Sequence, residues 1–401
     1  MNRILVFTST FPRFTSWDST PPFVYELSKR LAQEWIEIII LTPRVPGTPK
    51  YEYRDWIQIH RYSYFFSENL EKLNDGAILP NLKNNKWLYF QIPFFLFFGL
   101  YNLIRIMKIL KINTIHAHWI IPQWLLAVIA KKLFFPKLRI IVTSHGWDIF
   151  WLRWRLSTYC KKIVLKNIET LTVVSSSIQQ EVVRLGAPPE LQTIIAPMWV
   201  DDNQFHPDKY DQTIKSTYNI QGKCLLFVWR LAEKKWVRYL IDAMPRLIQK
   251  YPDIKLLIIW HGPLEQELRD QVTFLKINTN IIFVWSVPNT ELPKFYATAD
   301  IFIWPSIEAQ DWDSEWFWLV FVEAILSGCI TLWSHIHWIS DIIEDGRTGF
   351  FIKDRDPIDI EQKIIQCIEH NDFDTKKARE IIKNKFSWNI ISKQYIEILN
   401  K

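Results

Sequence analysis

The stretch CLLFVWRLAEKKWVRYLIDAMPRLIQKYPDIKLLIIW (224–260) contains one complete structural unit. It begins with the apolar run CLLFVW (224–229) and ends with IKLLIIW (254–260), and the residues between these runs have a helical pattern. Strands that are apolar throughout and separated by helices are typical of parallel sheets covered on both faces. The stretch therefore predicts a strand, a helix and a second strand parallel to the first.

The same alternation continues along the rest of the chain. The predicted strands are RILVFT (3–8), IEIIIL (36–41), NTIHAH (113–118), LRIIVTSH (138–145), ETLTVVSS (169–176), CLLFVW, IKLLIIW, NIIFVW (280–285), DIFIWPS (300–306) and CITLW (329–333). Two such series predict two doubly wound α/β domains. We expect one domain over residues 1–205 and another over 206–385, with the last helix, 386–401, packing back on the first.

The composition is that of a soluble globular protein, with 49% apolar and 22% charged residues. The net charge of +6 comes without a basic stripe interleaved with aromatic residues, so we expect no nucleic-acid partner. The four cysteines are far apart, which suggests neither a disulfide framework nor a zinc site made of cysteines. MNRILVFTST (1–10) runs directly into a strand and does not resemble a signal peptide, so we expect a cytoplasmic protein.

Residues 88–104, LYFQIPFFLFFGLYNLI, form the most apolar stretch of the chain. Its length and its internal Gln, Pro and Asn argue against a membrane span. Two interpretations stay open. The stretch is a buried helix, or it is a partly exposed apolar face that docks on the inner membrane surface, with Arg105, Lys108 and Lys111 just beyond it. Residues 61–86 are irregular and are expected to form an excursion between elements.

Glycine is rare and tryptophan is abundant, with 10 and 21 residues of the 401, whereas glycine usually supplies about 7% of a chain. Several tryptophans end predicted strands: Trp229, Trp260, Trp285 and Trp333. The carboxyl ends of parallel strands form the ligand crevice, where tight turns and close approach of backbone to phosphate call for glycine. Tryptophan therefore stands where the local pattern favours the smallest residue.

Two further tryptophans occupy positions that favour glycine for backbone reasons. Trp35 lies between a helix and a strand, where a glycine C-cap is expected. Trp56 follows Asp55, where an Asp-Gly turn would fit. Trp119 and Trp388 have apolar neighbours, and we expect them to be ordinary packing residues.

With glycine at these sites, the chain resembles the retaining nucleotide-sugar glycosyltransferases of group 1, or family 4. The segments that carry the resemblance are FVWRLAEKKWVRYLIDAM (227–244), IIWHGPLEQEL (258–268), DIFIWPS…EWFWLVFVEAILSGC (300–329), DIIEDGRTGFFI (341–352), HAHWIIPQW (116–124) and TSHGWD (143–148). The resemblance implies a GT-B fold, in which two Rossmann-like, doubly wound domains face a central cleft. Our hypothesis for the tryptophans is that the gene reads UGA as glycine and was translated with a table that reads UGA as tryptophan.

The resemblance implies that Arg230 and Lys235 grip the diphosphate of the donor, where positive groups stabilise the departing dianion. On spacing alone the two residues could equally be surface cations at a helix start. The resemblance also implies that Glu323 binds the ribose hydroxyls and that Glu315 lies by the donor sugar. A carboxylate suits vicinal hydroxyls because it can accept two hydrogen bonds. The backbone beside Glu315 belongs to Trp316, Phe317, Trp318 and Leu319. The alternatives for the two glutamates are a glycosidase-like pair and a solvated helix.

In the first domain the resemblance places His118 near the reacting sugar, and His145 and Asp148 near the sugar or the acceptor. The histidines could instead ligate zinc or be core histidines bonded to backbone. The segment FPRFTSWDSTPPF (11–23) resembles a glycine-rich donor and acceptor loop that contains Trp17 and Asp18, although Asp18 stands where a second glycine is common.

The implied activity is transfer of a hexosyl-type sugar, with retention and without a metal, from a nucleotide sugar to a glycan or lipid-linked acceptor, as in polysaccharide biosynthesis. The nucleotide sugar is a substrate, and no cofactor is expected. No side chain is assigned as a nucleophile. The alternatives are a GT-B sugar-nucleotide epimerase and, if the tryptophans are genuine, a non-catalytic protein that binds sugar nucleotides or glycans.

Overall fold

The chain divides into two compact units. The structure, a computed structural model, describes residues 3–13, 23–75, 78–150, 155–198, 200–228, 237–259, 264–284, 287–305, 319–334, 344–369 and 372–400. One unit comprises Met1–Pro197 together with Ile391–Lys401, and the other comprises Met198–Ile390. The sequence placed the boundary after residue 205, but Val200 and Phe205 are buried in the core of the second unit.

The first unit is built on an eight-stranded sheet. Its strands are β1 (Arg3–Phe7), β2 (Glu37–Pro43), β3 (Tyr51–Arg54), β4 (Ile57–Tyr62), β5 (Thr114–His118), β6 (Arg139–Ser144), β7 (Thr170–Val173) and β8 (Gln192–Ile195). Their order is β3-β4-β2-β1-β5-β6-β7-β8, and every pair is parallel except β3 with β4. β1 and β2 are buried almost throughout, as expected for strands covered on both faces.

The second unit is built on a six-stranded parallel sheet. Its strands are β9 (Cys224–Val228), β10 (Lys255–Ile259), β11 (Ile281–Val284), β12 (Ile301–Trp304), β13 (Ile330–Ser334) and β14 (Phe350–Ile352). Their order is β11-β10-β9-β12-β13-β14. The first sheet contains the same arrangement, β4-β2-β1-β5-β6-β7, so both units are doubly wound. The strand order reverses between β1 and β5 and between β9 and β12, and such switch points are where open α/β sheets bind ligands.

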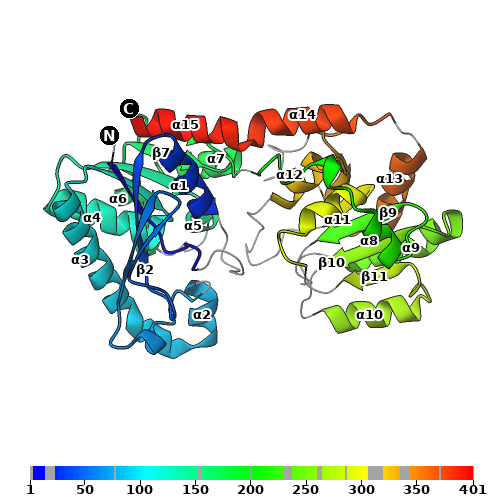
Figure 1. The fold of residues 1–401 in the computed structure, drawn as a ribbon, viewed down its shortest axis with the longest axis horizontal. Helices are drawn as coiled ribbons and strands as arrows, with labels where there is room; N and C mark the ends of the chain where they lie inside the picture. The colour runs from blue at the N-terminus through cyan, green and yellow to red at the C-terminus, as the bar shows by residue number, and fades with distance from the viewer. Residues whose placement is uncertain are drawn as a thin grey trace. The chain divides into compact units, whose positions relative to one another are not determined.

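Helices cover both sheets (Figure 1). Those of the first unit are α1 (Phe23–Gln33), α2 (Ile78–Asn84), η2 (Lys86–Gln91), α3 (Ile92–Leu110), η3 (Ile120–Trp124), α4 (Leu125–Leu133), α5 (Trp147–Phe150), α6 (Arg155–Leu165), α7 (Ser176–Arg184) and, from Ile391 on, α15 (Trp388–Asn400). Those of the second are η4 (Pro207–Lys209), α8 (Gln212–Thr217), α9 (Val237–Lys250), α10 (Glu265–Phe274), α11 (Leu292–Thr298), α12 (Leu319–Leu326), α13 (Pro357–Glu369) and α14 (Thr375–Phe386). The α/β class predicted from the sequence is confirmed.

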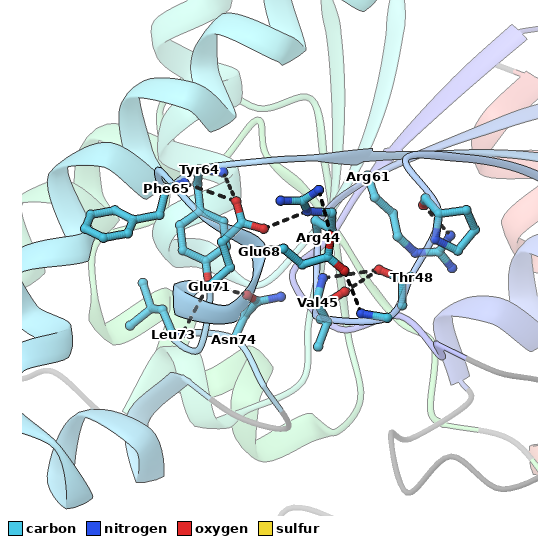
Figure 2. A network of polar contacts seen from close by, with 12 residues as sticks. Arg44, Val45, Thr48, Arg61, Tyr64, Phe65, Glu68, Glu71, Leu73 and Asn74 are labelled. Carbon is cyan, nitrogen blue, oxygen red and sulfur yellow. Dashed lines mark hydrogen bonds and ion pairs between the residues drawn. The ribbon is translucent and has the colours of Figure 1, made fainter.

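A polar network holds the excursion that follows β4 (Figure 2). It includes the short helix η1 (Glu68–Leu70). The Glu71 carboxylate is fully buried; it accepts hydrogen bonds from the backbone N–H groups of Tyr64 (2.8 Å) and Phe65 (3.1 Å) and pairs with Arg44 Nε at 2.8 Å. A buried carboxylate is tolerated when it is bonded in this way. The segment therefore has a fixed conformation in spite of its irregular sequence.

The last helix, α15, is bonded to the first sheet. The Tyr395 hydroxyl lies 3.1 Å from Thr143 Oγ1 on β6 and 3.2 Å from Thr172 Oγ1 on β7. Arg139 donates hydrogen bonds to the carbonyls of Leu399 and Ile398. These contacts explain why Ile391–Lys401 belongs to the first unit although the second unit precedes it in the chain.

Candidate functional site

Five of the predicted site residues are described by the structure: His118, His145, Asp148, Leu319 and Glu323. The others lie outside the described residues: Trp17, Asp18, Arg230, Lys235, Glu315, Trp316, Phe317 and Trp318. The described residues lie in both units, three in the first and two in the second.

His118 and His145 lie together in the first unit at the carboxyl ends of neighbouring strands. His118 is the last residue of β5, beside the switch point, and His145 directly follows β6. His118 Nδ1 is 3.1 Å from His145 Nε2, and the two rings are nearly parallel. Burial lowers the pKa of His145 to about 3 and holds the pKa of His118 well below its usual value. Both imidazoles are therefore neutral near pH 7, and each can donate one hydrogen bond and accept another.

The outer nitrogens of this pair, His118 Nε2 and His145 Nδ1, are buried and have no hydrogen-bond partner among the described residues. The same holds for both amide atoms of Gln123, which is fully buried in the π-helical turn η3. Buried polar groups that stay unpaired cost free energy, so these atoms are suited to a polar ligand. Gln123 was not predicted as a site residue, although it lies in the segment HAHWIIPQW (116–124) that carries the family resemblance.

Asp148 is held in α5 immediately after this pair. Gly146 has φ 97°, a left-handed backbone that favours glycine, and it turns the chain from β6 into α5. The Ser144 hydroxyl donates to Asp148 Oδ1 at 2.8 Å, and the Gly146 N–H lies 3.3 Å from Ser144 Oγ. The segment SHGWD (144–148) thus brings His145 and Asp148 to the same end of the sheet.

His116 has a different role from His118, although both lie on β5. Its Nε2 is 2.8 Å from Thr143 Oγ1, within the network that continues to Tyr395. Burial lowers the pKa of His116 to about 3. His116 is thus joined to the core by a side-chain hydrogen bond and not by backbone, and its Nδ1 is buried without a partner among the described residues.

A polar hollow lies at the carboxyl ends of β1 and β2. It is lined by Ser9, Thr10, Phe11, Arg13, Thr42, Pro43, Val45, Thr48, Arg61 and Asn74. Arg13 pairs with Asp75 at 2.6 Å, and Arg61 Nη1 with Glu52 at 2.8 Å. Phe11 and Arg13 belong to the segment FPRFTSWDSTPPF (11–23), whereas no motif indicated Arg61 and Asn74, which β4 and the excursion after it bring to the hollow.

In the second unit, Leu319 begins α12 and Glu323 lies one turn further on. Burial raises the pKa of the Glu323 carboxyl from 4.5 to about 7. The Tyr296 hydroxyl approaches this carboxyl and offsets part of the rise, although the pair misses the geometry of a full hydrogen bond. The Glu323 residue as a whole is half-buried, and a carboxyl whose pKa is raised in this way is typical of functional sites.

Among the residues that the structure describes, three tryptophans have positive φ, which is unusual for a bulky residue. Trp35 (φ 62°) ends α1, with the backbone bonds Trp35 N–H to Ala32 O and Ile36 N–H to Leu31 O that define a Schellman cap. Asp55 (φ 48°) and Trp56 (φ 66°) form the two-residue loop between β3 and β4. Hairpin loops with positive φ at both positions strongly prefer Asn-Gly or Asp-Gly.

The third tryptophan with positive φ is Trp119, with φ 73°, immediately after β5. The expectation that Trp119 is an ordinary packing residue was wrong, since its backbone adopts a conformation that favours glycine. Trp388 is buried, in agreement with a packing role. Trp333 is also buried, and it lies inside β13 without a positive φ. Trp229, Trp260 and Trp285 lie outside the described residues.

Within the described ranges, no group of three or more His, Cys, Asp or Glu side chains is arranged to hold a metal ion. The two site histidines are bonded to each other through ring nitrogens. Toward a ligand they would act as neutral hydrogen-bonding groups.

Comparisons with known proteins match both halves of the chain. Residues 211–388 match the family described as Glycosyl transferases group 1, and residues 22–202 match Glycosyltransferase Family 4. N-acetyl-alpha-D-glucosaminyl L-malate synthase of Bacillus anthracis is 23% identical over 378 residues, which cover 92% of this chain and 90% of that protein. A GDP-mannose-dependent alpha-(1-6)-phosphatidylinositol monomannoside mannosyltransferase of Mycolicibacterium smegmatis is 24% identical over 54% of this chain and 58% of that protein.

Solved structures share the fold. Sucrose-phosphate synthase of Thermosynechococcus elongatus has a TM-score of 0.76 at 17% identity, covering 100% of this chain and 98% of that chain. Alr3699/HepE of Anabaena, in complex with UDP, has a TM-score of 0.72 at 16% identity and covers all of both chains. The predicted GT-B fold, with two Rossmann-like domains, is confirmed.

Proposed function

We propose that this chain, which belongs to the group 1 glycosyltransferases with the GT-B fold, moves a hexosyl-type sugar from a nucleotide sugar to a glycan or lipid-linked acceptor with retention of configuration. The observation that carries the proposal is the pair His118 and His145 beside the switch point of the first sheet. Both imidazoles are buried and neutral, and their outer nitrogens have no hydrogen-bond partner among the described residues. The printed names of relatives support a nucleotide-sugar donor, since one is GDP-mannose-dependent and one structure contains UDP.

In this proposal the donor is held by the second unit. Glu323 accepts hydrogen bonds from the ribose hydroxyls, and Arg230 and Lys235 neutralise the diphosphate. Glu315 and the backbone of residues 316–319 contact the donor sugar. These assignments rest on the motifs of the sequence, and the position of Glu323 on α12 is compatible with them.

The first unit contributes hydrogen-bonding groups to the reacting sugar and the acceptor. His118, His145 and Asp148 bond to sugar hydroxyls, and the Gln123 amide adds a donor and an acceptor. The loop that contains Trp17 and Asp18 contacts the acceptor or the donor. No metal and no cofactor takes part in the proposed reaction, and a chelator such as EDTA should leave the rate unchanged.

We further infer that many of the tryptophans are glycines in the natural protein. The support comes from Trp35, Trp56 and Trp119, each of which has the left-handed backbone that glycine adopts at little cost. The codons of the gene test this directly. UGA at these positions would agree with the inference, and UGG at Trp35, Trp56 and Trp119 would refute it.

If the tryptophans are genuine, a non-catalytic protein that binds sugar nucleotides or glycans is the second candidate. One observation favours it: the Trp119 ring centre lies 4.8 Å from that of His145, where a sugar would have to approach. A sugar-nucleotide epimerase is the third candidate function.

The experiment is incubation of the purified chain with UDP-glucose, UDP-N-acetylglucosamine and GDP-mannose, with nucleoside diphosphate and sugar products followed over time. Slow release of nucleoside diphosphate supports the transferase. A changed sugar with no release supports the epimerase, and binding without turnover supports the binding protein.

A matched pair of variants tests the donor site. Glu323→Gln should weaken nucleoside diphosphate binding by about 10- to 100-fold, since a hydrogen bond to a charged group contributes about 1.5–3 kcal/mol. Glu380→Gln changes an exposed carboxylate on α14 and should leave binding unchanged. Equal affinity in both variants would remove Glu323 from the donor site.

A further inference from the structure

A continuous helical segment, Lys86–Leu110, runs through η2 and α3 and is apolar and long enough to cross a bilayer, with a mean hydropathy of 1.5. One face of α3 is nevertheless built into the first unit: Phe95, Gly99, Leu103 and Met107 are buried at four-residue spacing. A Cβ on Gly99 would lie only 3.2 Å from Leu126 of α4 and from the Tyr62 hydroxyl. The helix is therefore packed along the unit, next to α4 (Figure 1), and is not free to span a membrane in this fold.

The other side of the segment presents large apolar side chains to solvent. We call the exposed residues Trp87, Phe90, Phe97, Tyr101 and Ile109 the α3 face. Between 48% and 65% of each of these side chains is exposed. Trp and Tyr side chains of this kind are enriched at membrane–water interfaces, where an apolar ring and a polar tip are both accommodated.

The charge of the chain is concentrated in the same region. Residues 76–147 contain nine Lys and Arg and no Asp or Glu, whereas the rest of the chain has three more acidic than basic residues. The whole positive net charge of +6 therefore arises in this segment.

Seven of these nine cations are exposed, and no ion pair joins any of the seven to a carboxylate among the described residues. They are Lys83, Lys86, Arg105, Lys108, Lys111, Lys132 and Lys137. Lys108 lies 5.7 Å from the ring centre of Phe134, which is exposed at the end of α4. Arg105 and Lys108 follow Phe97 and Tyr101 at the spacing of one helix face, so these two cations lie on the same side of α3 as the exposed rings. An apolar helix face with unpaired cations around it is complementary to an anionic lipid surface.

We propose that the α3 face docks on the surface of a bilayer that contains anionic lipid, with α3 lying in the plane of the interface. The aromatic rings enter the boundary between headgroups and acyl chains, and Arg105, Lys108 and their neighbours contact anionic headgroups. The protein is then peripheral on the membrane. This docking does not depend on the proposed transferase activity, because the α3 face contains none of the residues assigned to the reaction.

The test is co-sedimentation of the full chain with vesicles of phosphatidylcholine alone and of phosphatidylcholine mixed with phosphatidylglycerol. The chain should pellet with the mixed vesicles and stay in solution with the neutral ones. Each Lys or Arg near an anionic surface contributes about a fivefold gain in partitioning, so Arg105→Glu with Lys108→Glu should reduce partitioning at least about 20-fold. Phe97→Ser with Tyr101→Ser should also weaken it, and since both rings are exposed this pair should fold normally by circular dichroism.

The matched control is Lys209→Glu with Lys376→Glu, which reverses two exposed charges in the second unit and gives the same net charge. It should bind the mixed vesicles as the unchanged protein does. Failure to pellet with the anionic vesicles, or an equal loss in the control, would overturn the proposal. Retention on the vesicles through an alkaline carbonate wash would also overturn it, because that result indicates a span. Loss of mixed-vesicle binding in both the charge and aromatic variants, with the control unchanged, supports it.

Discussion

Tryptophans lie at the carboxyl edges of both sheets, but the physical constraints on them differ. At the first edge, Trp119 follows β5 with φ 73°, beside the neutral pair His118 and His145. At the second, Trp304 and Trp333 continue β12 and β13 with ordinary strand backbone, fully buried, and pack edge-on against Phe321. A glycine would relieve backbone strain at the first edge, whereas at the second it would remove packing.

The edges also differ in electrostatics. The histidines of the first edge have lowered pKa values, and Glu323 of the second has a raised pKa. Burial causes both shifts, because it disfavours the charged form of either group. Acid should therefore destabilise the first unit through its histidines, and a rise toward neutral pH should destabilise the second through Glu323.

The largest expected effect comes from the packed edge. Trp333→Ala should lower the free energy of unfolding by about 3–5 kcal/mol, the usual cost of removing a buried tryptophan or phenylalanine. The measurement is guanidinium unfolding of the chain with the printed sequence. Trp333→Phe is the control and should cost clearly less, since it keeps an aromatic ring against Phe351 (5.1 Å between ring centres). An unchanged free energy of unfolding in Trp333→Ala would show that this tryptophan contributes no packing energy. The contrast between the two sheet edges would then be wrong.

The next largest effect is the pH dependence of stability that Glu323 causes. Its pKa is raised in the fold from 4.5 to about 7, so its contribution to stability is fully present below pH 4.5 and is lost as the pH rises to about 7. The loss is on the order of 3 kcal/mol. Glu323→Gln should remove this slope and be more stable than the unchanged chain at pH 8, as followed by denaturant midpoints across that range. An unaltered slope would mean that the carboxyl is hydrated.

That prediction also separates stability from function at one residue. The same Glu323→Gln substitution should stabilise the fold at neutral pH and weaken nucleotide binding. Local rules are commonly broken at functional sites at a cost in stability. A variant that lost both properties would indicate a structural role for Glu323.

The third predicted effect, the contribution of His145 to stability, has the opposite dependence on pH. His145 has its pKa lowered from 6.5 to about 3, so its contribution is present above pH 6.5 and is lost as the pH falls. At pH 5 the loss should be about 2 kcal/mol. His145→Asn should reduce the acid sensitivity of the first unit, read from amide hydrogen exchange on β5 and β6 at pH 5 and pH 8. Acid sensitivity that is unchanged in the variant would place the titrating group elsewhere.

The sequence predicted the sheets better than the sites, for identifiable reasons. All ten predicted strands are present, because continuous apolar runs such as LLII (256–259) have few alternatives to a buried parallel strand. β3, β4, β8 and β14 were missed; all four are short or partly exposed, and YEYR (51–54) and IQIHRY (57–62) mix polar with apolar residues. The hydrophobic pattern likewise favoured a packing role for Trp119, because a pattern reports burial and contains no information on φ.

Some of the site residues could be predicted from the sequence and others could not. His118 and His145 could be predicted because each ends a strand, and strand ends of one parallel sheet meet at the same edge. Gln123, Arg61 and Asn74 could not, because their positions depend on a π-helical turn, a late strand and an excursion. Only the packing of those segments brings the three side chains to the carboxyl edge of the sheet.

The smallest effects test the strained tryptophans directly. A left-handed backbone costs a residue with a Cβ about 1–2 kcal/mol, a cost that glycine avoids. Trp119→Gly should therefore be more stable than Trp119→Ala by about 1 kcal/mol, since both substitutions remove the indole and only one removes the Cβ. The measurement is the difference between their unfolding free energies.

Trp35 isolates the backbone contribution further, because 81% of this residue is exposed and the loss of its ring should cost little. Trp35→Gly should stabilise the chain by about 1 kcal/mol, and Trp35→Ala should leave it nearly unchanged, because alanine keeps the Cβ in the Schellman cap. Gly186 (φ 83°) and Gly328 (φ 93°) also have positive φ, and their replacement by alanine should destabilise the chain by a similar amount. If glycine and alanine at position 35 gave equal stabilities, the left-handed backbone there would not be maintained, and the distinction between the strained and the packed tryptophans would lose its physical basis.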